Sequence, residues 1–221
     1  MRISVITPVF SIAGVPLAQV RFARALARRG HQVDLVIGRI DPSHPFPEVP
    51  EINVIELGKA QVRSMLQPLR RYLQTARPDV VFSAEDHLNA VVLLAAITTG
   101  SRAKISCSSR VTPFDTYSNA FLSKRWVLKQ FMRAVMWRAN ALTCVSKDMV
   151  LQYRTIFRKS PHVAVYNIVD DRRSRDLMTE PVDHPWLANP QGNVLVAAGR
   201  LAPWKGFADL IRAVRLLVDG G

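Results

Sequence analysis

Short apolar runs alternate along the chain with longer segments in which apolar residues recur at helical spacing. The short runs predict buried strands at residues 2–9, 32–37, 52–57, 79–83, 103–108, 141–145 and 163–170. The longer segments predict helices at residues 17–29, 62–76, 88–99, 119–138 and 148–157. Strands that alternate with helices are typical of an α/β fold with a Rossmann-like, doubly wound parallel sheet.

Three residues that disturb regular structure refine these boundaries. Pro8 is expected to end the first strand, and Pro68 is expected to kink its helix or to move the start of that helix. Gly30 follows a helical stretch and is expected to form its C-cap.

A second α/β unit is predicted to begin near residue 193. Residues 194–198 are small or apolar and predict a buried parallel strand, and residues 207–217 repeat apolar side chains at helical spacing. The loop between them carries Arg200, Lys205 and Gly206. Glycine lets the backbone approach a ligand closely, and the unpaired N–H groups of a helix N-terminus favour an anion. The loop therefore fits a diphosphate, although two basic residues that only solvate a turn are the alternative.

This loop resembles a known sequence motif. Gly199-Arg200-Leu201 and Lys205-Gly206-Phe207 are similar to the Gly-Arg-Leu-x-x-x-Lys-Gly-Phe stretch that opens the second domain of GT-B glycosyltransferases, specifically the retaining family 4 (glycosyl transferases group 1). The resemblance implies that Arg200, Lys205 and Gly206 bind the diphosphate of a nucleotide-sugar donor. It implies the same for Gly14, which stands where the family carries a glycine pair, although Ala13 replaces the first glycine and a tight turn explains Gly14 equally well.

The resemblance also implies two domains. Residues 1–170 would form an acceptor-side Rossmann-like domain, residues 171–192 a linker, and residues 193–221 the start of a nucleotide-sugar-binding domain. The family's pair of Glu residues, which is associated with donor binding and the retaining chemistry, has no counterpart before Gly221. We therefore expect a chain that is truncated within its second domain and inactive by itself.

Further candidates follow the predicted strands, because ligands of open parallel sheets bind at the carboxyl ends of the strands. His87 and Arg110 each lie in such a loop and are expected to contact the acceptor or the transferred sugar. His87 is in addition the one catalytic candidate. Asp86, beside it, offers a carboxylate to sugar hydroxyls or an N-cap to the next helix.

Positive charge dominates the composition. The chain has 30 Lys and Arg against 17 Asp and Glu, a net charge of +13, which implies an anionic partner. Residues 100–159 hold twelve basic and two acidic residues, so this part alone contributes a net charge of ten. Neither zinc-finger spacing nor an RNA-recognition signature accompanies the charge, so no nucleic-acid partner is expected.

The predicted helix at 119–138 concentrates this charge. Arg125, Lys129 and Arg133 form a stripe that Trp126 and Trp137 flank. Cations beside indole rings are typical of a helix that lies on an anionic membrane surface. A solvated basic face whose Trp side chains are covered by neighbouring loops is the alternative.

The expected location is the cytoplasm, with peripheral association at the inner face of the cell membrane. The first residues lack the pattern of a signal peptide, and the longest apolar run, residues 90–99, is about half of a membrane span. Cys107 and Cys144 have neither metal spacing nor the density of a disulfide scaffold, so both are interpreted as reduced thiols of the core.

The combined interpretation is a hexosyltransferase. It would move a hexose from a nucleotide-diphosphate sugar to a lipid-linked or polysaccharide acceptor in cell-envelope glycan synthesis. Arg200 and Lys205 would neutralise charge on the leaving diphosphate, so neither a metal nor a cofactor is expected. A nucleotide-sugar epimerase of similar fold and a non-catalytic basic membrane-surface module remain as alternatives.

Overall fold

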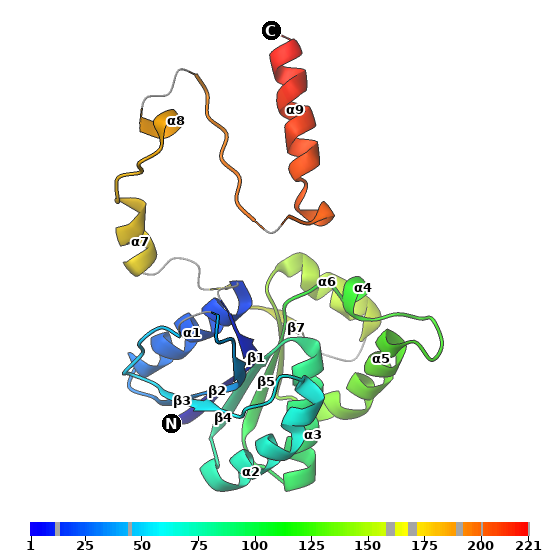
Figure 1. Cartoon of the computed structure of the whole chain (residues 1–221). Helices are drawn as coiled ribbons and strands as arrows, with labels where there is room; N and C mark the ends of the chain where they lie inside the picture. The colour runs from blue at the N-terminus through cyan, green and yellow to red at the C-terminus, as the bar shows by residue number, and fades with distance from the viewer. Residues whose placement is uncertain are drawn as a thin grey trace. The chain divides into compact units, whose positions relative to one another are not determined.

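A computed structural model of the chain describes residues 1–11, 14–43, 46–157, 162–167, 172–188, 192–199 and 201–220. The chain divides into two compact units, Met1–Asp171 and Arg172–Gly221 (Figure 1). The first unit is α/β with a parallel sheet, which confirms the predicted fold class.

Seven strands of the described residues form one sheet in the order β3-β2-β1-β4-β5-β6-β7, and every pairing is parallel. The strands are β1 (Arg2–Phe10), β2 (Gln32–Ile40), β3 (Asn53–Glu56), β4 (Val80–Ala84), β5 (Lys104–Ser109), β6 (Ala141–Cys144) and β7 (His162–Ala164).

Helical segments connect these strands and make up the regular structure of the second unit. In the first unit they are α1 (Gly14–Ala27), the 3₁₀ turn η1 (Val62–Met65), α2 (Leu66–Ala76), α3 (Asp86–Thr99), α4 (Pro113–Thr116), α5 (Lys124–Val135), the 3₁₀ turn η2 (Met136–Arg138) and α6 (Lys147–Ile156). In the second unit they are α7 (Arg172–Met178), α8 (Pro185–Ala188), the 3₁₀ turn η3 (Pro203–Lys205) and α9 (Phe207–Asp219).

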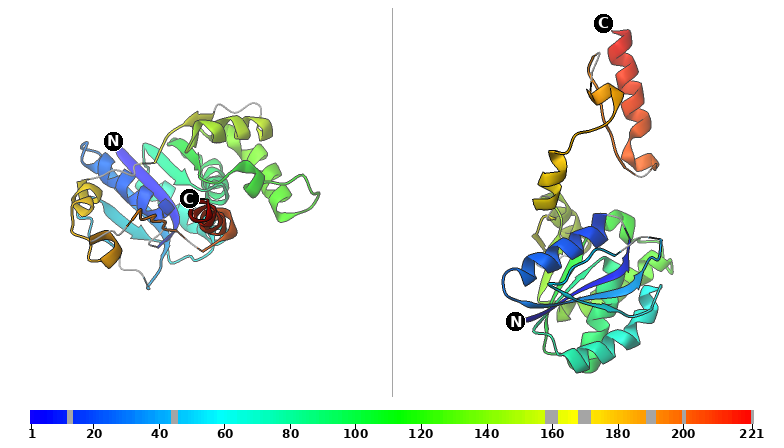
Figure 2. Two further views of the ribbon diagram at one scale, coloured as in Figure 1. Left: turned by 90° about the horizontal axis from the view of Figure 1, so that it is seen from above. Right: turned by 60° about the vertical axis from the view of Figure 1, so that its left-hand side comes forward.

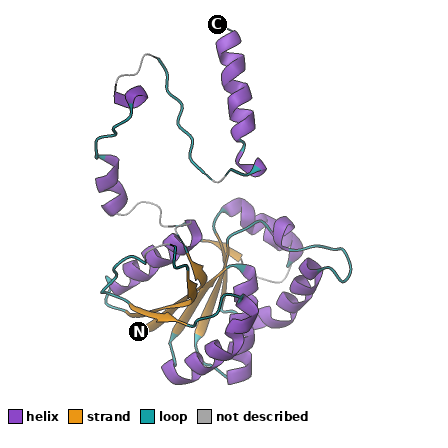
Figure 3. Ribbon diagram, viewed as in Figure 1, coloured by secondary structure: helices purple, strands orange, loops and turns teal. Residues whose placement is uncertain are grey.

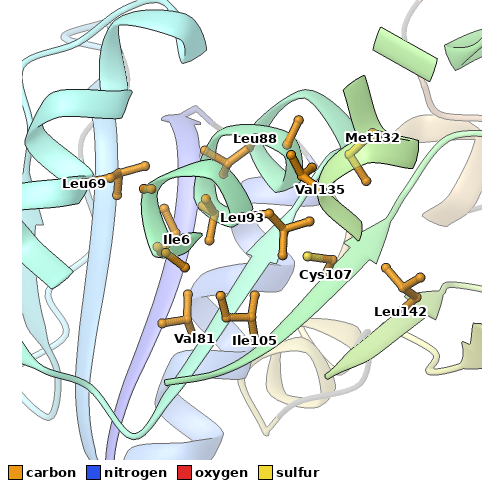
Figure 4. Packing of buried hydrophobic residues seen from close by; sticks show 14 of the residues in the cluster. Ile6, Leu69, Val81, Leu88, Leu93, Ile105, Cys107, Met132, Val135 and Leu142 are labelled. Carbon is orange, nitrogen blue, oxygen red and sulfur yellow. The ribbon is translucent and has the colours of Figure 1, made fainter. Parts of the chain in front are cut away.

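The two faces of the sheet carry different layers. Figure 2 shows α1 on one face and α2 and α3 on the other, and Figure 3 shows the sheet between them. The larger core joins α2, α3, α5 and α6 to inward residues such as Val81, Ile105 and Cys107 (Figure 4). The smaller core lies under α1 and covers β1 and β2. This layering leaves the α1-side face of β5 and β6 only half-buried.

Pro8 does not end the first strand, contrary to the prediction. The residue lies inside β1, and the ladder with β2 skips it, pairing Thr7 with Ile37 and Val9 with Arg39. Gly38 lies opposite, where a Cβ atom would stand 2.2 Å from the Pro8 carbonyl oxygen. The strand tolerates proline because the ladder skips this position, where no N–H is needed, and Gly38 leaves room for the Pro8 carbonyl.

Other boundaries shift because of capping. The helix predicted at 119–138 begins only at Lys124, since Ser123 is its N-cap and accepts a hydrogen bond from the Trp126 amide at 3.1 Å. Leu122 has a left-handed φ of 60°, which places the preceding residues outside the helix. Pro68 lies in the first turn of α2, whose start it was expected to move.

The strand predicted at 194–198 is absent, and these residues form an irregular segment. A strand needs a neighbour to receive its backbone hydrogen bonds, and the described part of the second unit contains no strand. The helix predicted after it is present as α9.

Candidate functional site

The candidate site lies where the strand order of the first unit reverses. From β1 the chain proceeds outward to β2 and β3, and then returns to β4 on the other side of β1. The carboxyl ends of strands at such a point leave a crevice in which open α/β sheets bind ligands. Gly14 begins α1 on the β1 side of this point, and on the β4 side Glu85 is the single residue between β4 and α3.

Glu85 has an unusual backbone conformation at this edge. Its φ of 81° and ψ of 132° are rare for a residue with a side chain and cost on the order of 1 to 3 kcal/mol. Two hydrogen bonds hold the conformation, because the Glu85 amide donates to the Ser108 carbonyl at 3.0 Å and its carbonyl accepts from the Asn89 amide at 2.9 Å. Strain of this kind is typical of functional sites, so Glu85 joins the candidates.

The next residue, Asp86, is a buried structural anchor. It is 5% exposed. Its Oδ1 accepts hydrogen bonds from the Tyr117 hydroxyl at 2.6 Å and the Ser109 hydroxyl at 3.0 Å, and the Tyr153 hydroxyl donates to Oδ2 at 3.0 Å. Both sequence interpretations of Asp86 are wrong, because Glu85 occupies the N-cap position and the Asp86 carboxylate is fully engaged inside the protein.

This anchor ties three segments of the chain together. Ser109 ends β5, Tyr117 follows α4 and Tyr153 belongs to α6. The two tyrosine rings pack edge to face, with centroids 6.2 Å apart. Burial raises the pKa of Asp86, and the three hydroxyl donors offset only part of this effect. The carboxylate therefore holds the edge of the sheet in place rather than meeting a ligand.

The charges of Arg110 and Glu85 affect each other's pKa. Burial lowers the pKa of Arg110, and the Glu85 carboxylate partly offsets this effect. Burial raises the pKa of Glu85, Asp86 raises it further, and Arg110 lowers it. The Arg110 guanidinium donates through Nη1 to the Asn167 side chain, and its buried Nε has no partner among the described residues. A half-buried carboxylate and a half-buried guanidinium with one unpaired N–H thus lie at the carboxyl edge.

The other predicted residues occupy varied places. His87 is exposed on the first turn of α3, beside Asp86. Gly14 has open space where a Cβ atom would stand, so packing does not require a glycine there. Thus His87 and Arg110 belong to one edge of the sheet, although His87 lies on the first turn of α3 and not in the predicted loop.

The predicted donor loop belongs to the second unit. Lys205 is exposed at the end of η3, and Gly206 has a left-handed φ of 70° that a glycine accommodates without strain. A Cβ atom on Gly199 would stand 3.3 Å from the Phe207 ring. Packing therefore explains part of this motif, whereas Arg200 lies outside the described residues.

The predicted basic stripe is interrupted. Lys129 is 7% exposed and donates through Nζ to the Asn119 side chain at 2.7 Å, so it does not lie on a membrane-facing surface. Trp126 is half-buried and packs against Phe121. Arg125 and Arg133 are exposed, and Trp137 is 70% exposed. Helical spacing alone did not reveal that the loop before α5 folds back over Lys129.

The described residues contain no group of three or more His, Cys, Asp or Glu that could hold a metal ion. No helix in the same ranges is long and apolar enough to cross a membrane.

A comparison with protein families identifies the fold's relatives. A family profile described as "Glycosyl transferase 4-like domain" matches residues 13–167. The chain belongs to this glycosyltransferase family. The match contains Glu85, Arg110 and the Asp86 anchor. No curated protein matches the sequence.

Solved structures with the same fold are glycosyltransferases of low sequence identity. The apo form of the lipopolysaccharide outer core galactosyltransferase WaaB has 13% identity and a TM-score of 0.58, with 77% of this chain and 46% of that chain covered. Sucrose-phosphate synthase from Thermosynechococcus elongatus has 13% identity, a TM-score of 0.58 and coverage of 83% and 54%. HepE from Anabaena, in complex with UDP and glucose, has 17% identity, a TM-score of 0.58 and coverage of 97% and 57%. The chain spans about half the length of these proteins.

Proposed function

We propose that this glycosyltransferase domain takes part in moving a hexose, with retention of configuration, from a nucleotide-diphosphate sugar to a lipid-linked or polysaccharide acceptor in cell-envelope glycan synthesis. The observation that carries the proposal is the strained backbone of Glu85, with Arg110 at the end of the neighbouring strand on the same carboxyl edge of the sheet. The UDP and glucose bound by HepE and the lipopolysaccharide activity named for WaaB support the substrate classes.

The edge residues suit contact with a sugar. A carboxylate such as Glu85 accepts hydrogen bonds from sugar hydroxyls, and the Arg110 guanidinium donates to ring or hydroxyl oxygens. Both side chains are half-buried, and interactions with charged groups strengthen where water is partly excluded. His87, exposed on α3, is assigned a third contact with the acceptor or the transferred sugar.

The donor loop serves the leaving group in this proposal. In the transfer, the acceptor oxygen forms a bond to the anomeric carbon, and the bond from that carbon to the diphosphate oxygen breaks. Lys205 and Arg200 neutralise the charge that grows on the diphosphate, and the backbone of Gly206 allows its close approach. No metal is assigned to this step.

The test is titration of the 221-residue chain with UDP-glucose and UDP-galactose, followed by product analysis with an acceptor glycan. Lys205→Ala is expected to weaken donor binding by roughly ten- to a hundredfold, because a charge-assisted hydrogen bond is worth about 1.5 to 3 kcal/mol. Arg212→Ala is the matched control, since Arg212 is an exposed cation on α9 outside the donor loop. Equal affinities for both variants and the parent chain would reject the donor-loop assignment.

Product analysis separates the alternatives. Conversion of one UDP-sugar into another without an acceptor would indicate an epimerase. Vesicle binding without any binding of UDP-sugars would indicate a membrane-surface module.

A peripheral membrane location is a second candidate property. Arg125, Arg133 and Trp137 are exposed on α5 and η2, which fits contact with anionic lipid at the cytoplasmic face of a membrane. The buried Lys129 adds nothing to this contact.

A further inference from the structure

A small cavity lies beneath α1, beside the candidate site. Its volume is about 90 Å³, and its lining comes from α1, from the half-covered face of β4, β5 and β6, and from the residues after β7. Phe22 and Phe82 form an apolar wall with ring centroids 4.8 Å apart. Val165 and Tyr166 are exposed at its rim. The cavity is therefore part apolar, and it can be reached from solvent.

Two hydrogen-bond donors in this lining have no partner. Gln19 on α1 is 2% exposed, and its Nε2 has no hydrogen-bond acceptor among the described residues. The same holds for the buried Nε of Arg110. A buried amide without a partner is costly to keep, so an unpaired donor of this kind requires an explanation. An acceptor oxygen of a bound ligand explains both.

The polar lining also includes the Asn167 side chain, which accepts from Arg110, and a row of hydroxyls. Ser106, Ser108 and Thr143 come from neighbouring strands, with Ser108 directly opposite Thr143 in the parallel register. Hydroxyl oxygens both donate and accept, so they can receive a ligand N–H group. The cavity combines unpaired donors, an aromatic wall and hydroxyl acceptors.

The size limits what the cavity can hold. At about 30 Å³ for each water in the liquid, 90 Å³ corresponds to roughly three waters. This space accommodates a planar substituent of about four heavy atoms and is too small for a hexose ring. An acetamido group has this size and carries a carbonyl oxygen, an N–H group and a methyl group.

We infer that the cavity binds the acetamido group of an N-acetylated sugar, with Gln19 Nε2 and Arg110 Nε donating to its carbonyl oxygen. The methyl group then packs against Phe22 and Phe82, and the N–H group donates to a strand hydroxyl. The choice of a sugar as carrier rests on the proposed function, whereas the unpaired donors and the cavity do not. Gln19 thus becomes a specificity-determining residue that favours N-acetylated over plain hexoses.

The test uses ¹⁵N-labelled 221-residue chain and nuclear magnetic resonance, with N-acetylglucosamine, glucose and glucuronate added separately. N-acetylglucosamine is expected to shift the side-chain amide signals of Gln19, and its acetyl methyl group is expected to receive the strongest saturation transfer. Glucose should bind at least tenfold more weakly. Equal binding of glucose, or tighter binding of glucuronate, would overturn the assignment to an acetamido group.

Gln19→Leu separates a binding role from a structural one. The leucine removes the unpaired amide at similar volume, so the midpoint of urea unfolding should stay the same or rise, while affinity for N-acetylglucosamine falls about tenfold. Gln74→Leu, at an exposed position of α2, should change neither value. A destabilised Gln19→Leu with unchanged sugar affinity would show that Gln19 serves packing alone.

The same samples distinguish this inference from the proposed function. If the cavity does not bind N-acetylglucosamine but UDP-sugars still bind, only the cavity assignment fails. If N-acetylglucosamine binds and UDP-sugars do not, the glycosyl-transfer proposal fails instead.

Discussion

Asparagine replacements of Asp86 and Asp34 should affect the stability of the first unit very differently at neutral pH. Both carboxylates are buried, Asp86 at 5% and Asp34 at 0% exposure. Asp86 accepts only from hydroxyls. Asp34 instead meets the Arg2 guanidinium at 3.0 Å, together with the Tyr72 hydroxyl at 2.6 Å and the Asn53 amide at 2.9 Å.

The hydrogen-bond geometry sets the expected magnitudes. In Asp86→Asn the oxygen keeps the bonds from Ser109 and Tyr117, and the new amide donates to the Tyr153 oxygen. The Tyr153 proton then goes to the Val111 carbonyl, which lies 2.9 Å away. All three hydroxyls stay paired. The second N–H of the new amide gains no acceptor from these partners, but the loss of a buried charge offsets this cost, so the free energy of unfolding at pH 7.5 should remain within about 1 kcal/mol of the parent value.

Asp34→Asn has no such rearrangement. Donors point at both carboxylate oxygens, so an amide placed on either side faces a donor, and the ion pair with Arg2 is lost. Because Arg2 is partly exposed, water screens the ion pair, and the unpaired donor dominates the loss. The expected cost is about 2 to 4 kcal/mol.

The pH dependence of the two variants should have opposite sign. Burial raises the pKa of Asp86 in the folded protein, so the parent loses stability as pH rises above the unfolded value of about 4. Burial alone would raise the pKa of Asp34 too, but the bonds from Tyr72, Asn53 and Arg2 outweigh it and lower the pKa. Stability from Asp34 is therefore complete above pH 4 and is lost as pH falls.

The assay is urea unfolding followed by circular dichroism at pH 4.5 and 7.5, on the parent chain and both variants. Asp86→Asn should gain stability relative to the parent between pH 4.5 and 7.5, whereas the cost of Asp34→Asn should be nearly the same at both values, because the stability from Asp34 is lost only below pH 4. Asp86→Ala is the third variant and should lose about 2 to 5 kcal/mol, since it leaves the Ser109 and Tyr117 hydroxyls unpaired. If Asp86→Asn costs as much as Asp34→Asn at pH 7.5, the charge of Asp86 is required and the reasoning is refuted.

Further predictions concern the surface, the thiols and the second unit. The fraction of the chain that sediments with anionic vesicles should decrease with added salt and in the double variant Arg125→Glu, Arg133→Glu. Trp137→Ala should decrease this fraction even at high salt. No binding to the vesicles at low salt would reject membrane contact. Burial raises the pKa of Cys107 and of Cys144 to about 12 each, so iodoacetamide at pH 8 should label neither thiol before urea is added. Rapid labelling of the folded chain would contradict the burial of these thiols. Hydrogen exchange should be slow in β1, β4 and β5 and fast in α9, whose apolar residues are largely exposed; equal protection in both would show that α9 is stabilised by contacts outside its own unit.

Local patterns in the sequence were enough to predict the architecture of the first unit. Short apolar runs between helically spaced segments predicted the parallel sheet and its connecting helices. Strands that are buried on both faces are apolar throughout, and helices with one buried face repeat apolar residues at helical spacing. The same reasoning placed His87 and Arg110 in loops at the carboxyl edge, since consecutive strands of such a fold all end there. Gln19 was not among the predicted site residues, because its burial on α1 became known only from the structure.

The tertiary structure decided which of these residues are free to act. Asp86 is anchored by hydroxyls up to 67 residues away in the chain, and Lys129 is buried through Asn119, ten residues before it. Residues 194–198 have the composition of a strand but form none, because a strand exists only when a neighbour receives its hydrogen bonds. Periodicity reports which side chains prefer burial, whereas pairing, desolvation and backbone strain such as that of Glu85 arise only once distant segments meet.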